Sequence, residues 1–391
     1  MPDPIPKIRV AKLLEPKPEV LAEEAAPKSG RQFPCPSCAA RLDFDPNAKG
    51  LKCPYCGYEK AIEKEADAEI VERDYLEYLS REEGKGKVIE GRSSEVRCGG
   101  CGANVLLEDK VQTERCPYCL TFLENEPVVA KAMVPPESVL PFALDLRNAR
   151  QAFDKWLVGL WFAPRGLSTF SSLGQLSGVY VPYWTYDANT QTYYTGQRGD
   201  NYSDTIWVTQ RQPDGTTREV AQTVMRVRWS YASGNVQHFF DDVLICGSKS
   251  IRGDLIQCIK DWKLLKLEPF TPAYLSGFRT ERYAIGLKEG FAKAKDVIEQ
   301  EITRLVYRDI GGDQQRIDDK KSRYSAITFK HILLPVWLAV YRYNGKTFQI
   351  LVNGRSGTVA GDRPYSIWKI GGLVAGILFA ILILILIVSR F

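Results

Sequence analysis

The spacing of apolar residues in the central part of the chain predicts two long helices. Apolar residues recur every three or four positions in LRNARQAFDKWLVGLWF (residues 146–162) and in GLKEGFAKAKDVIEQEITRLVYRDI (residues 286–310). This is the spacing of a helix that buries one face. We expect the first helix to end at Ala163-Pro164 and the second before Gly311-Gly312.

Between and after these helices, runs rich in β-branched and aromatic residues predict strands at residues 178–196, 204–234 and 327–354. Asp214-Gly215 and Asn344-Gly345 are typical hairpin turns. Pro182-x-Trp184 and Pro335-x-Trp337 resemble each other, which indicates either a duplicated helix-plus-antiparallel-sheet unit or a coincidence. The expected fold class is therefore α+β.

The pattern changes at the C-terminal end, where residues 370–388 carry no charge. As a helix they would span about 28 Å, close to the thickness of the bilayer's hydrocarbon core. Tyr365 and Trp368 stand where interfacial aromatic residues belong. We expect one transmembrane tail anchor. Arg363 and Lys369 favour a cytoplasmic main domain, although Arg390 weakens this asymmetry.

Residues 1–30 lack a sustained apolar period. The Pro- and Glu-rich residues 1–30 are predicted to be a flexible leader, and an exposed helix is expected within residues 61–86. The expected organisation is leader (1–30), zinc ribbon 1 (31–60), helical linker (61–92), zinc ribbon 2 (93–124), linker (125–141), α+β domain (142–365) and transmembrane anchor (366–391).

Eight of the ten cysteines form two matching quartets, in which two CxxC pairs are separated by fourteen residues. The quartets are Cys35, Cys38, Cys53 and Cys56, then Cys98, Cys101, Cys116 and Cys119. Two CxxC turns supply the four thiolates of a closed structural zinc site, so two Zn²⁺ per chain are expected. Disulfides, an iron–sulfur cluster and redox dithiols fit this spacing less well.

The two other cysteines and the residues that follow each CxxC pair also allow predictions. Cys246 and Cys258 lie outside the quartets and are expected to be buried, reduced thiols. Gly57 and Gly102 follow a CxxC pair, as a positive-φ turn favours, whereas Ala39 and Leu120 stand at the matching places. Those two turns are expected to form, with looser geometry.

Charge and catalytic motifs narrow the function. A net charge of +5 is small for 391 residues, and no basic–aromatic surface stands out in either ribbon, which favours protein docking over nucleic-acid binding. His238 with Asp241 and Asp242 could form a carboxylate–imidazole site, but a hydrogen-bonded strand edge is the simpler interpretation. His331 is expected to be structural, and no phosphate loop is complete. We expect no enzyme.

Several segments together carry a family resemblance: GLWFAP (159–164), VPYWTYDA (181–188), FFDDVLI (239–245), RDIGGD (308–313), ILLPVW (332–337) and LVNGRSG (351–357). With the two ribbons, residues 31–391 resemble a bacterial family of membrane-anchored TFIIB-type zinc-ribbon proteins. The family is often labelled primosomal protein N′, or replication-restart helicase-like. The sequence contains no helicase motif.

The resemblance implies a protein of the bacterial inner membrane whose partners are phage-shock-protein-A-like and SPFH/flotillin-like proteins encoded in envelope-stress operons. The function expected from the sequence is then a cytoplasm-facing, membrane-anchored zinc-binding adaptor that recruits proteins. The alternative is a membrane-tethered nucleic-acid-binding protein of replication or transcription. A third possibility is an enzyme with a pocket around His238, and a hydrophobic groove in the main domain would instead indicate lipid binding.

Overall fold

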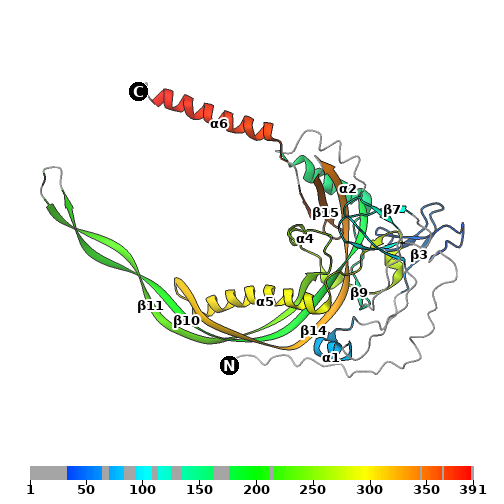
Figure 1. The fold of residues 1–391 in the computed structure, drawn as a ribbon, viewed down its shortest axis with the longest axis horizontal. Helices are drawn as coiled ribbons and strands as arrows, with labels where there is room; N and C mark the ends of the chain where they lie inside the picture. The colour runs from blue at the N-terminus through cyan, green and yellow to red at the C-terminus, as the bar shows by residue number, and fades with distance from the viewer. Residues whose placement is uncertain are drawn as a thin grey trace.

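The computed structural model describes residues 33–63, 70–82, 94–107, 113–124, 134–161, 176–211, 215, 217–343, 346–362 and 365–388. It is mixed α+β and mostly sheet, with two four-cysteine clusters and one apolar C-terminal helix (Figure 1). This confirms the expected fold class at that level. The predicted leader, residues 1–30, lies outside the described residues.

A long antiparallel sheet forms the centre of the molecule, with the strand order β11-β10-β14-β15-β16. Its strands are β10 (Ser177–Arg211), β11 (Thr217–Cys246), β14 (Gln314–Tyr343), β15 (Lys346–Asn353) and β16 (Val359–Gly361). The predicted strand segments are therefore parts of longer, continuous strands.

Both predicted hairpin turns fall where the strands reverse. β10 and β11 pair as far as Arg211↔Thr217, and Gly215 between them has φ of +85°. β14 and β15 pair as far as Tyr343↔Lys346, which leaves a two-residue connection at 344–345. The two residues of that second turn lie outside the described part of the chain.

The remaining elements are short. They are β1 (Asp43–Asp45), β2 (Gly50–Lys52), β3 (Glu59–Ala61), β4 (Arg73–Asp74), α1 (Tyr75–Glu82), β5 (Ser94–Arg97), β6 (Asn104–Leu107), β7 (Thr113–Arg115), β8 (Phe122–Glu124), β9 (Ser138–Val139), α2 (Leu146–Val158), α4 (Gly253–Cys258), η1 (Leu264–Lys266), β12 (Glu268–Pro269), η2 (Pro272–Leu275), β13 (Arg279–Thr280), α5 (Leu287–Ile310) and α6 (Ile367–Val388).

The two predicted helices are present. α5 ends before Gly311 and Gly312, whose φ angles of +66° and +74° cannot continue a helix. α2 ends at Val158, a turn earlier than expected, with Gly159 as its C-cap. Its N-cap Asp145 accepts a hydrogen bond from the Asn148 backbone N–H at 2.7 Å.

Helix α5 covers the concave side of the curved sheet (Figure 1). Its apolar stripe at three- and four-residue spacing is buried against β10, β11 and β14 and comprises Leu287, Phe291, Ala294, Ile298, Ile302 and Val306. Gly290 lies on this face because a Cβ there would approach the Tyr186 hydroxyl to 2.5 Å. That hydroxyl donates to the Leu287 carbonyl at 2.8 Å. The glycine thus allows the first turn of α5 to lie close to the sheet.

The two Pro-x-Trp segments make matching hydrogen bonds in adjacent strands. Trp184 Nε1 donates to the Ile285 carbonyl at 2.8 Å, two residues before α5. Trp337 Nε1 donates to the Leu144 carbonyl at 3.0 Å, two residues before α2. Each indole therefore fixes the backbone that leads into a helix.

Gly247, directly after β11, and Gly354, directly after β15, also make matching hydrogen bonds. Gly247 N donates to the Pro182 carbonyl at 2.8 Å, and Gly354 N donates to the Pro335 carbonyl at 2.9 Å. The carbonyl of each glycine accepts two N–H groups just before a helix, those of Ala284 and Ile285 for Gly247 and those of Ala143 and Leu144 for Gly354. The two halves of the domain thus use one hydrogen-bonding arrangement twice.

Beyond Gly199, β10 and β11 continue as a two-stranded ribbon that projects from the body (Figure 1). The ladder with β14 ends at Gly199↔Gln314, whereas β10 runs on to Arg211. These twelve residues extend for about 40 Å. Trp207 and Met225, on one face of this ribbon, are 68% and 67% exposed, and no residue of β10 from Asp200 to Arg211 is buried, so neither face is covered by the rest of the described chain.

Replacing Gly290 by alanine tests the close approach of α5 to the sheet. We expect Gly290→Ala to destabilise the chain by roughly 1–3 kcal/mol, because the added methyl displaces the buried Tyr186 ring and overrides alanine's better helix propensity. The midpoint of thermal unfolding of the full-length protein in detergent measures this loss of stability. Gly253→Ala is the control, because a Cβ added at Gly253 would meet nothing within 4 Å. Equal midpoints for the two variants would contradict the assignment.

Candidate metal centres

The four cysteines of ribbon 1 converge on one point. Cys35 and Cys56 Sγ lie 3.5 Å apart, as do Cys38 and Cys53 Sγ. All four sulfurs lie within 4.8 Å of one another. Thiolates at the corners of a tetrahedron around Zn²⁺ would be separated by about 3.8 Å, given a Zn–S distance near 2.3 Å. The cluster therefore has the size of a four-thiolate metal site.

Ribbon 2 repeats this arrangement. Cys98 and Cys119 Sγ are 3.4 Å apart, and Cys101 and Cys116 Sγ are 3.6 Å apart. All ten cysteines of the chain are free thiols. The predicted quartets are thus both assembled and suitably placed for metal binding, which confirms the cysteine grouping; the geometry does not identify the metal.

Each CxxC pair is closed by the same turn. The residue after the second cysteine has positive φ, from +56° at Ala39 to +77° at Gly102, and its N–H donates to the carbonyl of the first cysteine at 2.8–3.1 Å. Leu120, with φ of +63°, makes this bond at 2.9 Å, as tightly as its glycine counterparts. The turns at Ala39 and Leu120 therefore form, and the looser geometry expected for them is absent.

Hydrogen bonds around the sulfurs favour thiolates. The backbone N–H of Cys56 lowers the pKa of the Cys53 thiol to about 6. In ribbon 2, the hydrogen bond with Cys116 lowers the pKa of Cys101 to about 5, and it raises the pKa of Cys116 above its ordinary value. Without metal, one sulfur of a close pair therefore keeps its proton. A cation bound among them would displace that proton.

Ribbon 1 packs on the main domain through its first hairpin. Phe44 N donates to the Ser276 carbonyl at 2.9 Å, and Ser276 Oγ donates to the Leu42 carbonyl at 2.6 Å. The Phe44 ring meets Tyr274 edge-on, with ring centres 5.3 Å apart. These contacts come from the hairpin of β1 and β2. In the second CxxC turn they leave Tyr55 and Cys56 exposed, whereas Cys53 is buried.

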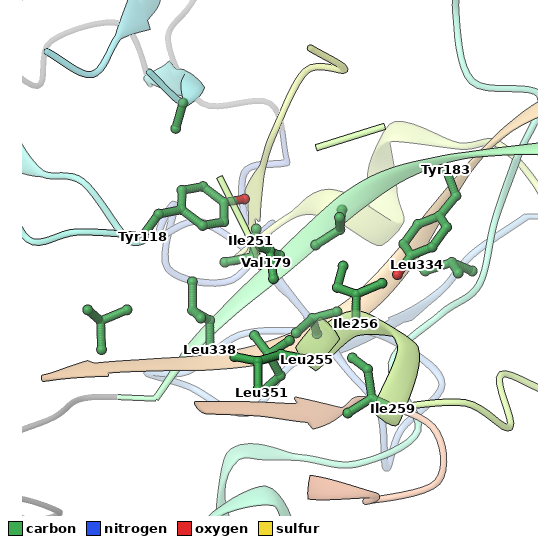
Figure 2. Close-up of a cluster of buried hydrophobic side chains, with 14 of the residues drawn as sticks. Tyr118, Val179, Tyr183, Ile251, Leu255, Ile256, Ile259, Leu334, Leu338 and Leu351 are labelled. Atoms are coloured by element: carbon green, nitrogen blue, oxygen red, sulfur yellow. The ribbon is translucent and has the colours of Figure 1, made fainter. Parts of the chain in front are cut away.

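Ribbon 2 packs on the main domain through its second CxxC turn as well as through its first hairpin. Tyr118, between Cys116 and Cys119, is 1% exposed and belongs to the same buried cluster as Val179 and Ile251 (Figure 2). Gln349 Nε2 donates both to the Tyr118 carbonyl at 3.0 Å and to the Ser250 carbonyl at 2.9 Å. The second CxxC turn of ribbon 2 is thus part of the main domain's core.

The corresponding tyrosine of ribbon 1 is in the opposite environment. Tyr55, in the equivalent CPYC turn, is 83% exposed, and Tyr58 beside it is 37% exposed. The sequences of the two turns gave no indication of this difference. It depends on which surface of the α+β domain lies next to each ribbon.

Buried beside Tyr118 is a carboxyl group that the sequence analysis did not find. Glu281 is 2% exposed, and its Oε1 accepts hydrogen bonds from Ser248 Oγ at 2.9 Å and Ser250 Oγ at 2.7 Å. Burial raises the pKa of this carboxyl to about 7. Nothing in the sequence around Glu281 marks it as buried, because its position depends on the bridge it forms with Val105 of ribbon 2.

The two remaining cysteines differ from each other. Cys246 is half-buried, and burial raises the pKa of its thiol to about 12, so it is a protonated thiol as expected. Cys258, at the last position of α4, is exposed. The expectation that Cys258 is buried was wrong, because α4 buries its Leu255 and Ile256 side and leaves its last residue in solvent.

The possible site around His238 is not assembled. Asp241 and Asp242 are joined by Asp187 rather than by His238, whose ring packs on Phe240 with centres 4.6 Å apart. Asp242 N donates to Asp187 Oδ1 at 2.6 Å, where a β-bulge interrupts the β10–β11 ladder.

Lys330 supplies positive charge to this acidic group. Its Nζ lies 2.9 Å from Asp242 Oδ1 and 2.9 Å from Glu72 Oε1. The ammonium group pairs with one of the three aspartates and with Glu72, so the arrangement is an ion-paired strand edge, the simpler of the two interpretations.

His331 is a buried structural residue, as expected. It is 5% exposed, its Nδ1 lies 2.9 Å from the Val134 carbonyl, and its ring lies against Trp184. Burial lowers its pKa to about 4, so the imidazole is neutral at physiological pH.

Helix α6 is long and apolar enough to cross a membrane. Its candidate span, Trp368–Val388, has a mean hydropathy of 3.1, and none of it is buried inside the protein. Figure 1 shows it projecting from the body. A core helix of a soluble protein would be covered, so the exposure of α6 fits an apolar environment supplied from outside the chain.

Comparison with known proteins gives one relative of unknown function. The chain is 23% identical over 348 residues to the uncharacterized protein YdjG of Bacillus subtilis (strain 168), across 88% of this chain and 93% of that protein. No protein-family model matches the chain, and no solved structure matches it.

Metal removal tests the two clusters. We expect about two Zn²⁺ per chain in the purified full-length protein, and one in either Cys53→Ser or Cys116→Ser, because a three-thiolate shell is incomplete. Elemental analysis measures the metal content.

Removal of the metal by a chelator should also lower the midpoint of thermal unfolding, since both clusters are continuous with the core. Cys258→Ser is the control and should keep both ions. A full-length protein that folds equally well without metal would refute the assignment.

The buried Glu281 predicts a pH dependence of stability. Folding raises its pKa to about 7, so the folded chain holds this proton more tightly than the unfolded chain does. The stabilisation is present at pH below the ordinary range of a carboxyl and is lost as pH rises toward 7. We expect Glu281→Gln to gain roughly 1–3 kcal/mol relative to wild type between pH 5 and pH 8.

Thermal midpoints at the two pH values measure this gain. Glu289→Gln, an exposed residue on α5, is the control and should shift equally at both. A pH-independent difference between Glu281→Gln and wild type would contradict the prediction.

Proposed function

We propose that the protein is a membrane-anchored zinc-binding adaptor that docks protein partners through ribbon 1. Helix α6 would hold it in the bilayer, and the two clusters would each hold a structural Zn²⁺. No catalytic role is part of this proposal. The observation that carries it is the contrast between two tyrosines in equivalent turns, Tyr55 and Tyr118.

Tyr118 supports the idea that a CPYC turn of this chain can bind a protein surface. Its ring and backbone are engaged by the α+β domain, through an apolar cluster and the Gln349 side chain. Tyr55 offers the same type of turn, and it is 83% exposed. Tyrosine is well suited to interfaces, because it has a large apolar ring and a polar end. Ribbon 1 is therefore the proposed docking surface, and ribbon 2 is its internally used counterpart.

The proposed compartment follows from the thiols and the charges. Ten free cysteines suit a reducing environment, and four thiolates at this spacing suit Zn²⁺. Lys369 at the start of α6 favours a main domain on the cytoplasmic side. The resemblance described above suggests the inner membrane of a bacterium and partners similar to phage-shock protein A and to SPFH/flotillin proteins.

The alternative, a membrane-tethered nucleic-acid-binding protein, has less support. Two basic residues of ribbon 1 are engaged within the ribbon: Arg41 Nε lies 2.8 Å from Asp43, and Lys52 Nζ lies 2.7 Å from Glu59. Paired cations offer less free charge to phosphates. This arrangement favours a protein partner.

We also infer that the α+β domain is a duplicated helix-plus-antiparallel-sheet unit. The matched bonds of Trp184 with Trp337, and of Gly247 with Gly354, support it. In this view, the first copy has a greatly lengthened hairpin.

Crosslinked purification from native membranes tests the docking proposal. We expect the Tyr55→Ala variant to recover only a small part of the proteins that co-purify with the wild type, because the central aromatic contact of the docking turn is removed. The control is Tyr231→Ala, a tyrosine on β11 that is 72% exposed, and it should keep them. Equal recovery from both variants would refute docking through ribbon 1, and enrichment of nucleic acid in place of proteins would favour the alternative.

A further inference from the structure

The C-terminal end of α2 lies beside the beginning of α6. Lys369 Nζ donates to the Trp161 carbonyl at 3.0 Å, across 208 positions of sequence. Figure 1 shows the same proximity of the two helices. Any bilayer that α6 enters at Trp368 must therefore begin close to the last turn of α2.

The side chains at this end of α2 suit a membrane interface. Val158 is 87% exposed and Trp161 is 73% exposed, next to Trp368, which is 92% exposed. Tryptophan is enriched at the headgroup level of membranes, where its ring is partly apolar and its N–H stays hydrated. The residues Val158, Trp161 and Trp368 form what we call the interfacial patch.

An open groove of about 730 Å³ adjoins this patch. It lies between α2 and the β15–β16 connection, and its walls include Leu144, Trp156, Leu160 and Val359. Lys155 also lines it, one turn before Val158 on α2. A largely apolar groove with one ammonium group offers an acyl chain a dry wall and a lipid phosphate a counter-charge.

We propose that the interfacial patch and the adjoining groove bind the phospholipid surface of the same membrane that α6 crosses, with Lys155 placed against an anionic headgroup. The proposal rests on the proposed anchoring by α6. It adds a second contact, which fixes the orientation of the α+β domain on the bilayer rather than leaving it free on one helix. The continuity of the patch with α6 favours a lipid surface over a protein partner.

Fluorescence quenching by brominated lipid tests this contact in the full-length protein. The protein is reconstituted in vesicles of phosphatidylcholine brominated near the headgroup, with or without phosphatidylglycerol. Trp161→Phe and Trp368→Phe should each remove a substantial share of the lipid-quenchable emission, and Trp156 in the groove accounts for the rest. Trp262→Phe, in the core and 6% exposed, should remove none. Lys155→Gln should abolish the extra quenching that phosphatidylglycerol produces in the wild type.

Two results separate the two proposals. If Trp368 is quenched and Trp161→Phe leaves the quenchable emission unchanged, the interfacial patch is refuted and the anchor stands. If neither residue contributes, the anchor itself is refuted, and this inference fails with it. If Lys155→Gln responds to phosphatidylglycerol as the wild type does, the assignment of the anionic headgroup to Lys155 is overturned.

Discussion

The antiparallel ladder between β10 and β14 is the interaction on which the other parts of this structure depend. It joins segments more than a hundred residues apart and aligns Tyr180 with Pro335. In this register, Trp184 and Trp337 point to the two places where the chain enters a helix. Both helices are thereby fixed at their first turn, and the loops around the ladder become the surfaces on which the two ribbons pack.

This arrangement gives the two cysteine modules different roles despite their matching sequences. Each module is too small to bury a sufficient core alone, so metal and the neighbouring domain both contribute to its folding. Ribbon 2 places its tyrosine-bearing turn under Gln349, inside the core. Ribbon 1 contacts the domain through Phe44, on its other hairpin, and its corresponding turn faces solvent.

Local patterns were sufficient for the parts of the fold that depend on neighbours in sequence. The α5 stripe, its Gly311-Gly312 end and the four-cysteine grouping were all predictable, because helical period, positive φ and CxxC geometry are local properties. The contacts of Glu281, the Asp187–Lys330 group and the exposure of Cys258 were not. Each depends on which distant strand or ribbon lies opposite, and one sequence carries no such information.

The outer part of the β10–β11 hairpin has a consequence for the fidelity of strand pairing. Where one face of a sheet is buried, a shift of one residue moves apolar side chains into water and is strongly disfavoured. Trp207 and Met225 are exposed already, so such a shift would cost little burial there. The correct pairing of β10 with β11 in the outer hairpin is therefore determined at its two ends, by the turn at Gly215 and by the buried ladder nearer the body.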